Sequence, residues 1–451
     1  MKPSKSEFNQ EHTMTAPVET TTLISMMQSA RQRTLELIAG LTQEQLIGPK
    51  LPTVNPMIWE IGHAAWFYEN FILRRHLGHA PLLERGDDLY DSIAIAHEKR
   101  WDLPVYPLDE MRDYMSSVLD TLVDHLGDGL ASERESYLYQ FTTFHEDMHC
   151  EAYTWARQTH GYPTPAFAPD GPGQAISAAD FGTGGLDGDA HIPGGAFPMG
   201  SAPESPFLFD NEKWAHDVVV APFRMARTPV ANKAFADFIA DDGYDREDLW
   251  SPEGWRWRTD THATHPVFWR GDGGQGWEIR NFDTRLPLAP NAPVIHVSWY
   301  EANAYCRWAD RRLPSEAEWE FAATMRPNAA GGLDKHPYPW GDADPTSEHA
   351  NLDGFALGCV DAAACAKGDS AWGCRQLIGN VWEWTSDTFQ PFDGFAPDDY
   401  KEYSAPLFND TKVLRGGAWT TRNRMINAKY RNYFGPARND VFAGFRTCAL
   451  D

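Results

Sequence analysis

The sequence predicts a two-domain chain of class α + (α+β), in which a helical bundle precedes a loop-rich mixed domain. Apolar residues recur at helical spacing through residues 21–161, which is typical of amphipathic helices. Between residues 163 and 190 this periodicity disappears and Pro, Gly, Ala and Asp dominate. Short strand-like runs separated by Gly, Pro and Trp follow. The length of 451 residues also exceeds one ordinary core, so two domains are expected.

Four segments of the first half are predicted to be helical. Pro56 suits the first turn of the second segment, and Ser132 with Glu135 forms a possible capping box at the start of the fourth. Gly161 and Pro163 would end that last helix. We expect the helices at residues 21–45, 56–76, 108–126 and 132–161.

These features predict the domain boundaries. We expect a disordered tail at residues 1–18, a four-helix metal-binding domain at 19–165, a linker at 166–189 and a mixed domain at 190–451. In the mixed domain, residues 217–221 and 294–298 have the apolar content of strands, and residues 300–308 and 315–323 have that of helices. Glu316 and Glu318 would favour the dipole of the second of these helices.

Three histidines in the helical half indicate a metal site. His145 and His149 are four residues apart, so both imidazoles lie on one helix face. His63 lies in a second apolar helix. Three neutral imidazoles can bind a divalent transition metal and leave positions open for other ligands. Hydrogen-bonded core histidines are the alternative. Glu146 points away from His145 and is expected to be solvated, while the role of Glu151 stays open.

The composition and the charge pattern argue against several classes of protein. The net charge of -25 and the lack of a Lys/Arg cluster argue against binding to nucleic acid or to an anionic membrane. Charges interrupt every apolar stretch before about 18 residues, so no membrane span is predicted. The polar start lacks the apolar core of a signal peptide, which predicts a cytoplasmic protein. The spacing of Cys359, Cys365 and Cys374 fits a zinc site poorly, and incidental thiols are favoured.

Five strings of the second half resemble the formylglycine-generating-enzyme fold, a C-type-lectin-like scaffold with little regular structure. The resemblance covers residues 190–451. Those enzymes use a pair of cysteines near the C-terminus, whereas this chain has only Cys448 there, so their chemistry is not expected. The strings are IPGGAFPMGS at 192–201, RRLPSEAEWEFA at 311–322, GNVWEWT at 379–385, VLRGGAW at 413–419 and AGFRT at 443–447.

The first half resembles the DinB-like four-helix bundle, and the two halves in this order resemble the non-heme iron enzymes that attach sulfur or selenium to hercynine. The resemblance implies that His63, His145 and His149 bind Fe(II), with dioxygen as co-substrate. It also aligns Tyr400 with a tyrosine that donates a proton at the iron centre. A phenol has a reference pKa near 10 and can therefore donate while uncharged.

The resemblance implies substrate-binding residues as well. Asn432 matches a hercynine-binding asparagine, and Tyr433 replaces a tryptophan but keeps an aromatic face for a quaternary ammonium. Phe434 replaces an aspartate that helps to hold γ-glutamylcysteine in ergothioneine enzymes. Met148 stands where those enzymes often have a glutamine. A phenyl ring cannot pair with an ammonium, so a different chalcogen donor is expected.

The local sequence around residues 54–63, 90–92 and 100–103 is most similar to the selenoneine synthase branch, which takes selenium from a selenosugar. The alternative enzyme forms a C–S bond from a cysteine-type thiol and needs cations for the carboxylates of that donor. The candidates are Arg75, Arg85, Arg100 and Arg438.

Two further alternatives belong to other classes. One is a non-catalytic binding protein with structural zinc. It is disfavoured because structural zinc sites usually have four protein ligands. The other is a zinc-dependent thiol transferase of the DinB type, which would need neither oxygen nor the second half of the chain.

Overall fold

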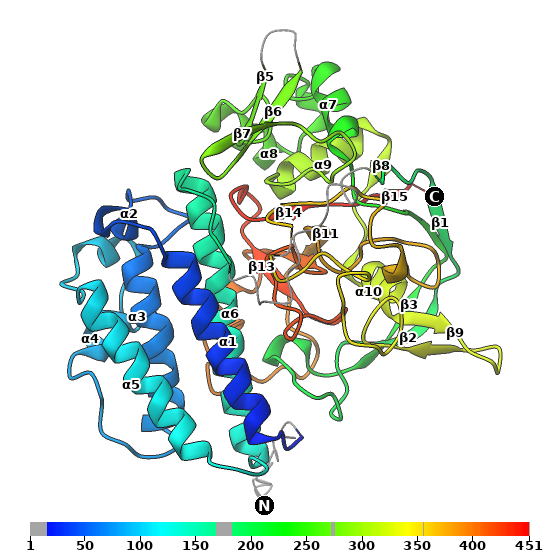
Figure 1. The fold of residues 1–451 in the computed structure, drawn as a ribbon. Helices are drawn as coiled ribbons and strands as arrows, with labels where there is room; N and C mark the ends of the chain where they lie inside the picture. Colours follow the sequence, from blue (N-terminus) through cyan, green and yellow to red (C-terminus); the bar gives the residue numbers. More distant parts are fainter. Residues whose placement is uncertain (1–15, 168–182, 272–275, 355, 451) are drawn as a thin grey trace, which may run out of the picture.

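The structure is a computed structural model and describes residues 16–167, 183–271, 276–354 and 356–450. Within residues 16–167 the long helices are α1 (Thr20–Ile38), α3 (Met57–Tyr68), α5 (Leu108–Leu126) and α6 (Glu133–His160). They form a bundle in which α6 packs on α1 and α3, and α5 packs on α1 and α3. Figure 1 shows this bundle beside a larger mixed domain, with α6 on the side that faces that domain.

The predicted capping box of α6 is confirmed. The Ser132 side chain accepts a hydrogen bond from the Glu135 backbone N–H, and the Glu135 side chain accepts one from the Ser132 backbone. Gly161 follows the helix in the left-handed conformation, at φ 68°, where a residue without Cβ is favoured. These signals fix both ends of the helix that carries the histidine pair.

Two predicted helices are interrupted. The segment 21–45 divides into α1 and the short α2 (Gln43–Ile47), because Gly40 adopts φ 75° and Thr42 begins a new capping box. The segment 56–76 continues from α3 into a π-helix, η1 (Glu69–Arg74). A single turn, α4 (Gly86–Tyr90), follows and packs on α3.

The mixed domain is built from small sheets with long irregular connections. Two sheets have four strands each, with the orders β13-β12-β11-β14 and β1-β4-β15-β8. The pair β2-β3, the pair β10-β9 and the sheet β5-β6-β7 lie around them. The strands are β1 (Asp189–Ile192), β2 (Gly195–Met199), β3 (His216–Val220), β4 (Phe223–Ala226), β5 (Trp269–Gly271), β6 (Trp277–Asn281), β7 (Thr284–Pro287), β8 (Arg311–Arg312), β9 (Met325–Pro327), β10 (Leu333–Lys335), β11 (Trp382–Thr388), β12 (Lys412–Arg415), β13 (Asn432–Phe434), β14 (Ala443–Gly444) and β15 (Cys448–Ala449).

The helices of this domain are α7 (Asn232–Ala240), α8 (Pro252–Thr261), α9 (Trp299–Trp308) and α10 (Glu316–Thr324). The two predicted helices are therefore present, and the run at 217–221 forms β3. The strand expected at residues 294–298 is wrong. This buried segment bonds irregularly, through the Val294 N–H to the Val230 carbonyl, and His296 takes φ 63°. The segment is apolar because it is buried between loops, and it does not pair as a strand.

The core of the mixed domain contains buried ion pairs. Arg415 pairs with Glu316 at 2.9 Å and with Glu320 at 2.6 Å, and Arg431 pairs with Glu316 at 2.7 Å. These side chains are almost fully buried. They connect α10, β12 and the segment before β13. Ionic contacts thus take the place of part of the apolar packing that longer helices and strands would supply.

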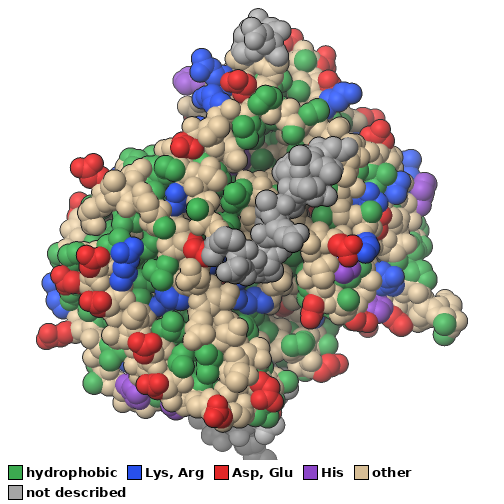
Figure 2. Space-filling model, in the orientation of Figure 1, with side chains coloured by type: hydrophobic (Ala, Val, Ile, Leu, Met, Phe, Trp, Pro, Cys, Tyr) green, Lys and Arg blue, Asp and Glu red, His purple; other side chains and the backbone are tan. Residues whose placement is uncertain are grey.

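The predicted tail at 1–18 lies largely outside the described residues, as does most of the predicted linker at 166–189. No helix within the described ranges is long and apolar enough to cross a membrane. On the face shown in Figure 2, acidic and basic side chains are interspersed over both domains.

Candidate metal centre and adjoining cavity

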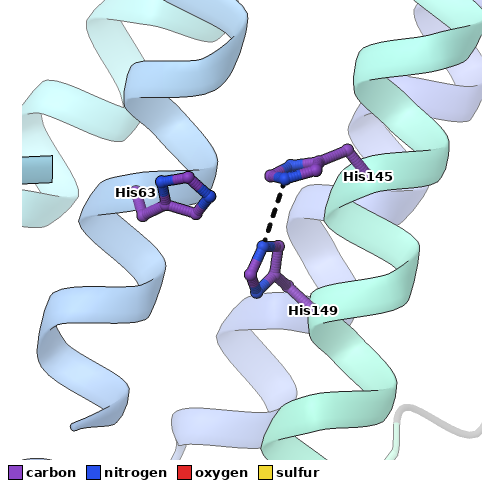
Figure 3. Close-up of side chains that lie close together, drawn as sticks. All are labelled: His63, His145 and His149. Atoms are coloured by element: carbon purple, nitrogen blue, oxygen red, sulfur yellow. Dashed lines mark hydrogen bonds between the residues drawn. The ribbon is translucent and has the colours of Figure 1, made fainter. Parts of the chain in front are cut away.

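The three histidines meet between α3 and α6. His63 extends from α3, and His145 and His149 extend from successive turns of α6, as Figure 3 shows. One nitrogen from each imidazole lies within 4.8 Å of the others. The Nε2 atoms of His145 and His149 are 3.3 Å apart. Helical spacing on α6 and the packing of α3 on α6 therefore bring the set together.

Hydrogen bonds fix which nitrogen is free on two of the rings. His63 Nδ1 lies 2.7 Å from the Tyr90 carbonyl, which only accepts, so this nitrogen carries the proton and Nε2 keeps its lone pair. His149 Nδ1 lies 2.7 Å from Glu60 Oε1, which gives the same assignment. His145 Nδ1 is buried without a hydrogen-bond partner. Lone pairs directed into one shared space fit a cation.

Burial and the neighbouring rings favour the neutral form of His63 and His145. Burial, followed by the nearby His149, lowers the pKa of His63 well below its usual value. Burial, His149 and His63 lower the pKa of His145 in the same way. Neutral imidazole is the form that binds a metal. The three histidines are also the only set of three or more His, Cys, Asp or Glu found to converge in this way within the described ranges.

Aromatic rings enclose one side of this centre. The His145 ring stacks on Phe67 at 3.6 Å between centroids, with an interplanar angle of 8°. Tyr400 approaches the same region edge-on, 5.2 Å from Phe67 and 6.3 Å from His145. Its hydroxyl lies 3.4 Å from Ser92 Oγ of the bundle domain. Burial raises the pKa of Tyr400, which favours the protonated phenol.

A cavity of about 380 Å³ lies beside His149 and is lined by residues of both domains. It is bounded by α6 and by the segment 403–438 of the mixed domain. All five predicted substrate-binding residues line it: Met148, Asn432, Tyr433, Phe434 and Arg438. Tyr400 is not part of this lining, whereas Tyr403 is. The predicted binding residues therefore line the cavity, whereas the predicted proton donor lies against Phe67 and near His145.

Arg438 is held at the cavity by neighbouring groups. Its guanidinium forms two hydrogen bonds to Asp440, at 2.6 and 2.8 Å, and lies 5.0 Å from the centroid of the Phe434 ring. The charge is therefore largely balanced by Asp440. The position that carries aspartate in the ergothioneine enzymes instead presents an apolar ring over this arginine.

The sequence analysis missed several residues of the site. Glu60 contacts His149, and its signal was a single acidic side chain inside the otherwise apolar helix α3. Tyr403, Tyr430 and Trp382 line the cavity, but nothing in their local sequence marks them. The Tyr403 and Tyr430 hydroxyls are 3.4 Å apart, and the Tyr403 hydroxyl also contacts Met148 Sδ at 4.0 Å.

Two glutamates of α6 gain defined roles. Glu146 is buried and pairs with Arg31 at 2.9 Å, so the expectation that it is solvated is wrong. Glu151 is buried at the cavity wall and accepts hydrogen bonds from Trp382 Nε1, at 3.0 Å, and from the Thr421 hydroxyl. Burial raises the pKa of Glu151 to about 7. This carboxyl joins the bundle to the mixed domain.

The fold and site together define a class: a DinB-type helical bundle with a three-histidine centre, closed by a sulfatase-modifying-factor-like domain. The DinB superfamily model matches residues 26–152. The model described as "Sulfatase-modifying factor enzyme 1-like domain" matches residues 181–450.

Curated relatives identify the family more closely. Hercynine oxygenase of Mycolicibacterium smegmatis is 33% identical, over 94% of this chain and 98% of the relative. Hercynine oxygenase of Mycobacterium tuberculosis is 35% identical, over 96% and 99%. Formylglycine-generating enzyme of Streptomyces coelicolor is 31% identical, over 64% of this chain and 95% of the relative. The chain belongs to the hercynine oxygenase family, which joins these two domains.

Proposed function

We propose that this chain is an iron- and dioxygen-dependent enzyme that forms a C–Se bond between a selenosugar and C2 of the hercynine imidazole. The observation that carries the proposal is the convergence of three imidazoles beside a cavity that also contains aromatic faces and a buried carboxyl. Fe(II) held by His63, His145 and His149 would supply the dioxygen binding and electron transfer that this oxidative coupling requires.

The cavity suits a small cation with an apolar body. Hercynine carries a quaternary ammonium, which is favoured by aromatic faces and by negative charge. Trp382, Tyr403 and Tyr430 supply the faces, and Glu151 supplies the carboxyl. Of the other carboxyls and cations lining the cavity, Glu60 is engaged by His149 and Arg438 by Asp440. Glu151 accepts hydrogen bonds from the neutral donors Trp382 and Thr421 and forms no ion pair among the described residues, so it is the carboxyl best suited to a bound ammonium.

The protein's own groups orient the reaction. With the ammonium between Glu151 and the rings, the hercynine imidazole extends along the cavity toward His149, because this histidine lines the cavity. Tyr400, whose ring lies 6.3 Å from that of His145, donates a proton from its phenol, and Ser92 Oγ at 3.4 Å holds that hydroxyl in place.

The choice of selenium rests on the cavity wall at position 434. Amino-thiol donors such as γ-glutamylcysteine carry an ammonium that needs a carboxylate partner. Phe434 offers none and packs on Arg438, which Asp440 already neutralises. A neutral selenosugar needs no such pair. The second candidate, C–S bond formation from a cysteine-type thiol, is supported by the names of the mycobacterial relatives.

The test is a competition between donors. The protein is loaded anaerobically with Fe(II) and supplied with hercynine, dioxygen and either a selenosugar, cysteine or γ-glutamylcysteine, and the products are identified by mass spectrometry. We expect the selenium product to exceed the sulfur products at least tenfold. Preferred formation of a sulfur product replaces the first candidate by the second. Equal turnover without dioxygen contradicts both.

A further inference from the structure

The three imidazoles differ in the hydrogen-bond partner of Nδ1, the ring nitrogen that does not face the other two imidazoles. His63 Nδ1 donates to a backbone carbonyl, and His145 Nδ1 has no partner. Only His149 Nδ1 donates to a carboxyl, that of Glu60. A carboxylate partner withdraws the Nδ1 proton toward itself and makes the opposite nitrogen a stronger electron donor. The ring that borders the cavity is therefore the one whose donor strength depends on a side chain.

Glu60 is placed for this role by the bundle itself. It lies one helical turn before His63 on α3 and is 2% exposed. Its Oε1 crosses to α6 and meets His149 Nδ1 at 2.7 Å. One carboxyl thus links the helix that carries one ligand to the helix that carries the other two. Glu60 is also one of the residues that line the cavity.

We propose that Glu60 is a positioning residue of the metal centre, which fixes His149 in its Nδ1–H tautomer and holds the Nε2 lone pair toward the other two imidazoles. This inference rests on the metal site of the proposed function. Carboxylates in this position typically change metal affinity by 10- to 100-fold. Without Glu60, His149 is free to exchange tautomers and to rotate into the cavity.

The other two rings do not depend on Glu60. His63 keeps its backbone partner in any side-chain variant, since the acceptor is the Tyr90 carbonyl. His145 is held by its stacking on Phe67. Replacement of Glu60 therefore weakens one of three ligands and leaves a site of lower affinity.

The experiment compares Glu60→Gln and Glu60→Ala with Glu69→Gln as a matched control. Glu69 is 1% exposed and follows α3 in the π-helix η1. It accepts hydrogen bonds from the Tyr114 hydroxyl and from the Leu82 backbone N–H, and contacts no imidazole. Full-length proteins are titrated with Co(II), an oxygen-stable probe, and with Fe(II) under anaerobic conditions. The Kd, the Co(II) absorption spectrum and the melting temperature are recorded.

We expect the Kd for Co(II) to rise about tenfold in Glu60→Gln, where an amide oxygen still accepts from Nδ1, and about 100-fold in Glu60→Ala. The Co(II) spectrum should shift in both. Glu69→Gln should lower the melting temperature without changing the Kd. Kd values within twofold of the unaltered protein in both Glu60 variants, with only the melting temperature lowered, would overturn the inference.

A His149→Ala variant separates this inference from the proposed function. If His149→Ala loses metal binding while the Glu60 variants retain it, the metal centre stands and only the role of Glu60 is wrong. If His149→Ala binds metal as tightly as the unaltered protein, the three-histidine centre itself is wrong, and the proposed function fails with it.

Discussion

The bundle and the mixed domain hold their parts of the site by different means. In the bundle, the ligand rings follow from helical spacing on α3 and α6, and apolar side chains pack the helices. In the mixed domain, the cavity wall comes from loops and the short strand β13, while buried ion pairs such as Arg415–Glu320 tie these segments together. Regular periodicity thus sets the cluster of three histidines, and long-range ionic contacts stabilise the segments that form the cavity wall.

The largest effect, on iron content and product formation, is expected from a substitution in the bundle. His145→Ala removes one of the three proposed ligands, an imidazole that packs on Phe67. We expect Fe(II) content and product formation to fall at least 100-fold, measured by metal analysis and mass spectrometry. The helical circular dichroism should stay unchanged, because alanine favours the helix. Full iron content with full turnover would show that His145 is not a ligand.

The ionic core of the mixed domain gives the next largest effect. Glu320→Gln removes the buried partner of Arg415, at 2.6 Å, and of Lys335, at 2.7 Å. Removal of one member of a buried ion pair costs about 3–5 kcal/mol, because the remaining charges stay buried. We expect this loss in the free energy of unfolding, measured with urea by tryptophan fluorescence. The exposed pair Lys367–Glu348 provides a control, in which Glu348→Gln should have little effect.

The same glutamate predicts an acid-sensitive mixed domain. Burial alone raises the pKa of Glu320, but Lys335 and Arg415 outweigh it and lower the pKa to about 2. A depressed pKa stabilises the folded state above the ordinary value of 4.5, and this stabilisation is lost as the pH falls from 4.5 toward 2. It amounts to about 3 kcal/mol. Urea unfolding between pH 5 and 3 should show the loss, and Glu320→Gln should flatten it.

The sequence predicts the bundle more closely than the mixed domain. The spacing of His145 and His149, the capping box at Ser132 and the apolar stripes are local signals, and the structure contains all of them. Glu316 shows the limit of such signals. Its place in the first turn of α10 was attributed to the helix dipole, whereas it pairs with Arg415 and Arg431 from distant segments. Partners about 100 residues away leave no local trace.

The residues that line the cavity also divide into those that the sequence identifies and those that it does not. The resemblance to known enzymes identified Met148, Asn432 and Tyr433, which line it. Trp382, Tyr430 and Glu151 were not identified as cavity residues. Their role depends on how α6 docks on β11, which no local pattern encodes. The assignment of Glu151 and Phe434 to substrate binding is a prediction, which the following two experiments test.

A smaller effect is expected at the docking carboxyl. Glu151→Gln keeps an oxygen acceptor for one of Trp382 and Thr421 and removes the charge that the carboxyl carries above its pKa of about 7. The assay is therefore run at pH 8. We expect the KM for hercynine to rise about tenfold, which corresponds to about 1.4 kcal/mol, with a small change in kcat. An imidazole substrate without the quaternary ammonium serves as the control, and its KM should stay the same. An equal rise for both substrates would indicate a general disturbance of the interface.

The smallest effect concerns the chalcogen donor. Phe434→Asp restores the residue of the ergothioneine enzymes beside Arg438, where Asp440 already provides one carboxylate. The added carboxylate can pair with the ammonium of an amino-thiol, and an exposed or half-buried pair of this kind contributes about 1 kcal/mol. The ratio of sulfur to selenium product should therefore rise about fivefold. Phe434→Asn, which has the same shape without the charge, should leave the ratio unchanged. If both variants change the ratio equally, ring size at position 434, and not charge, selects the donor.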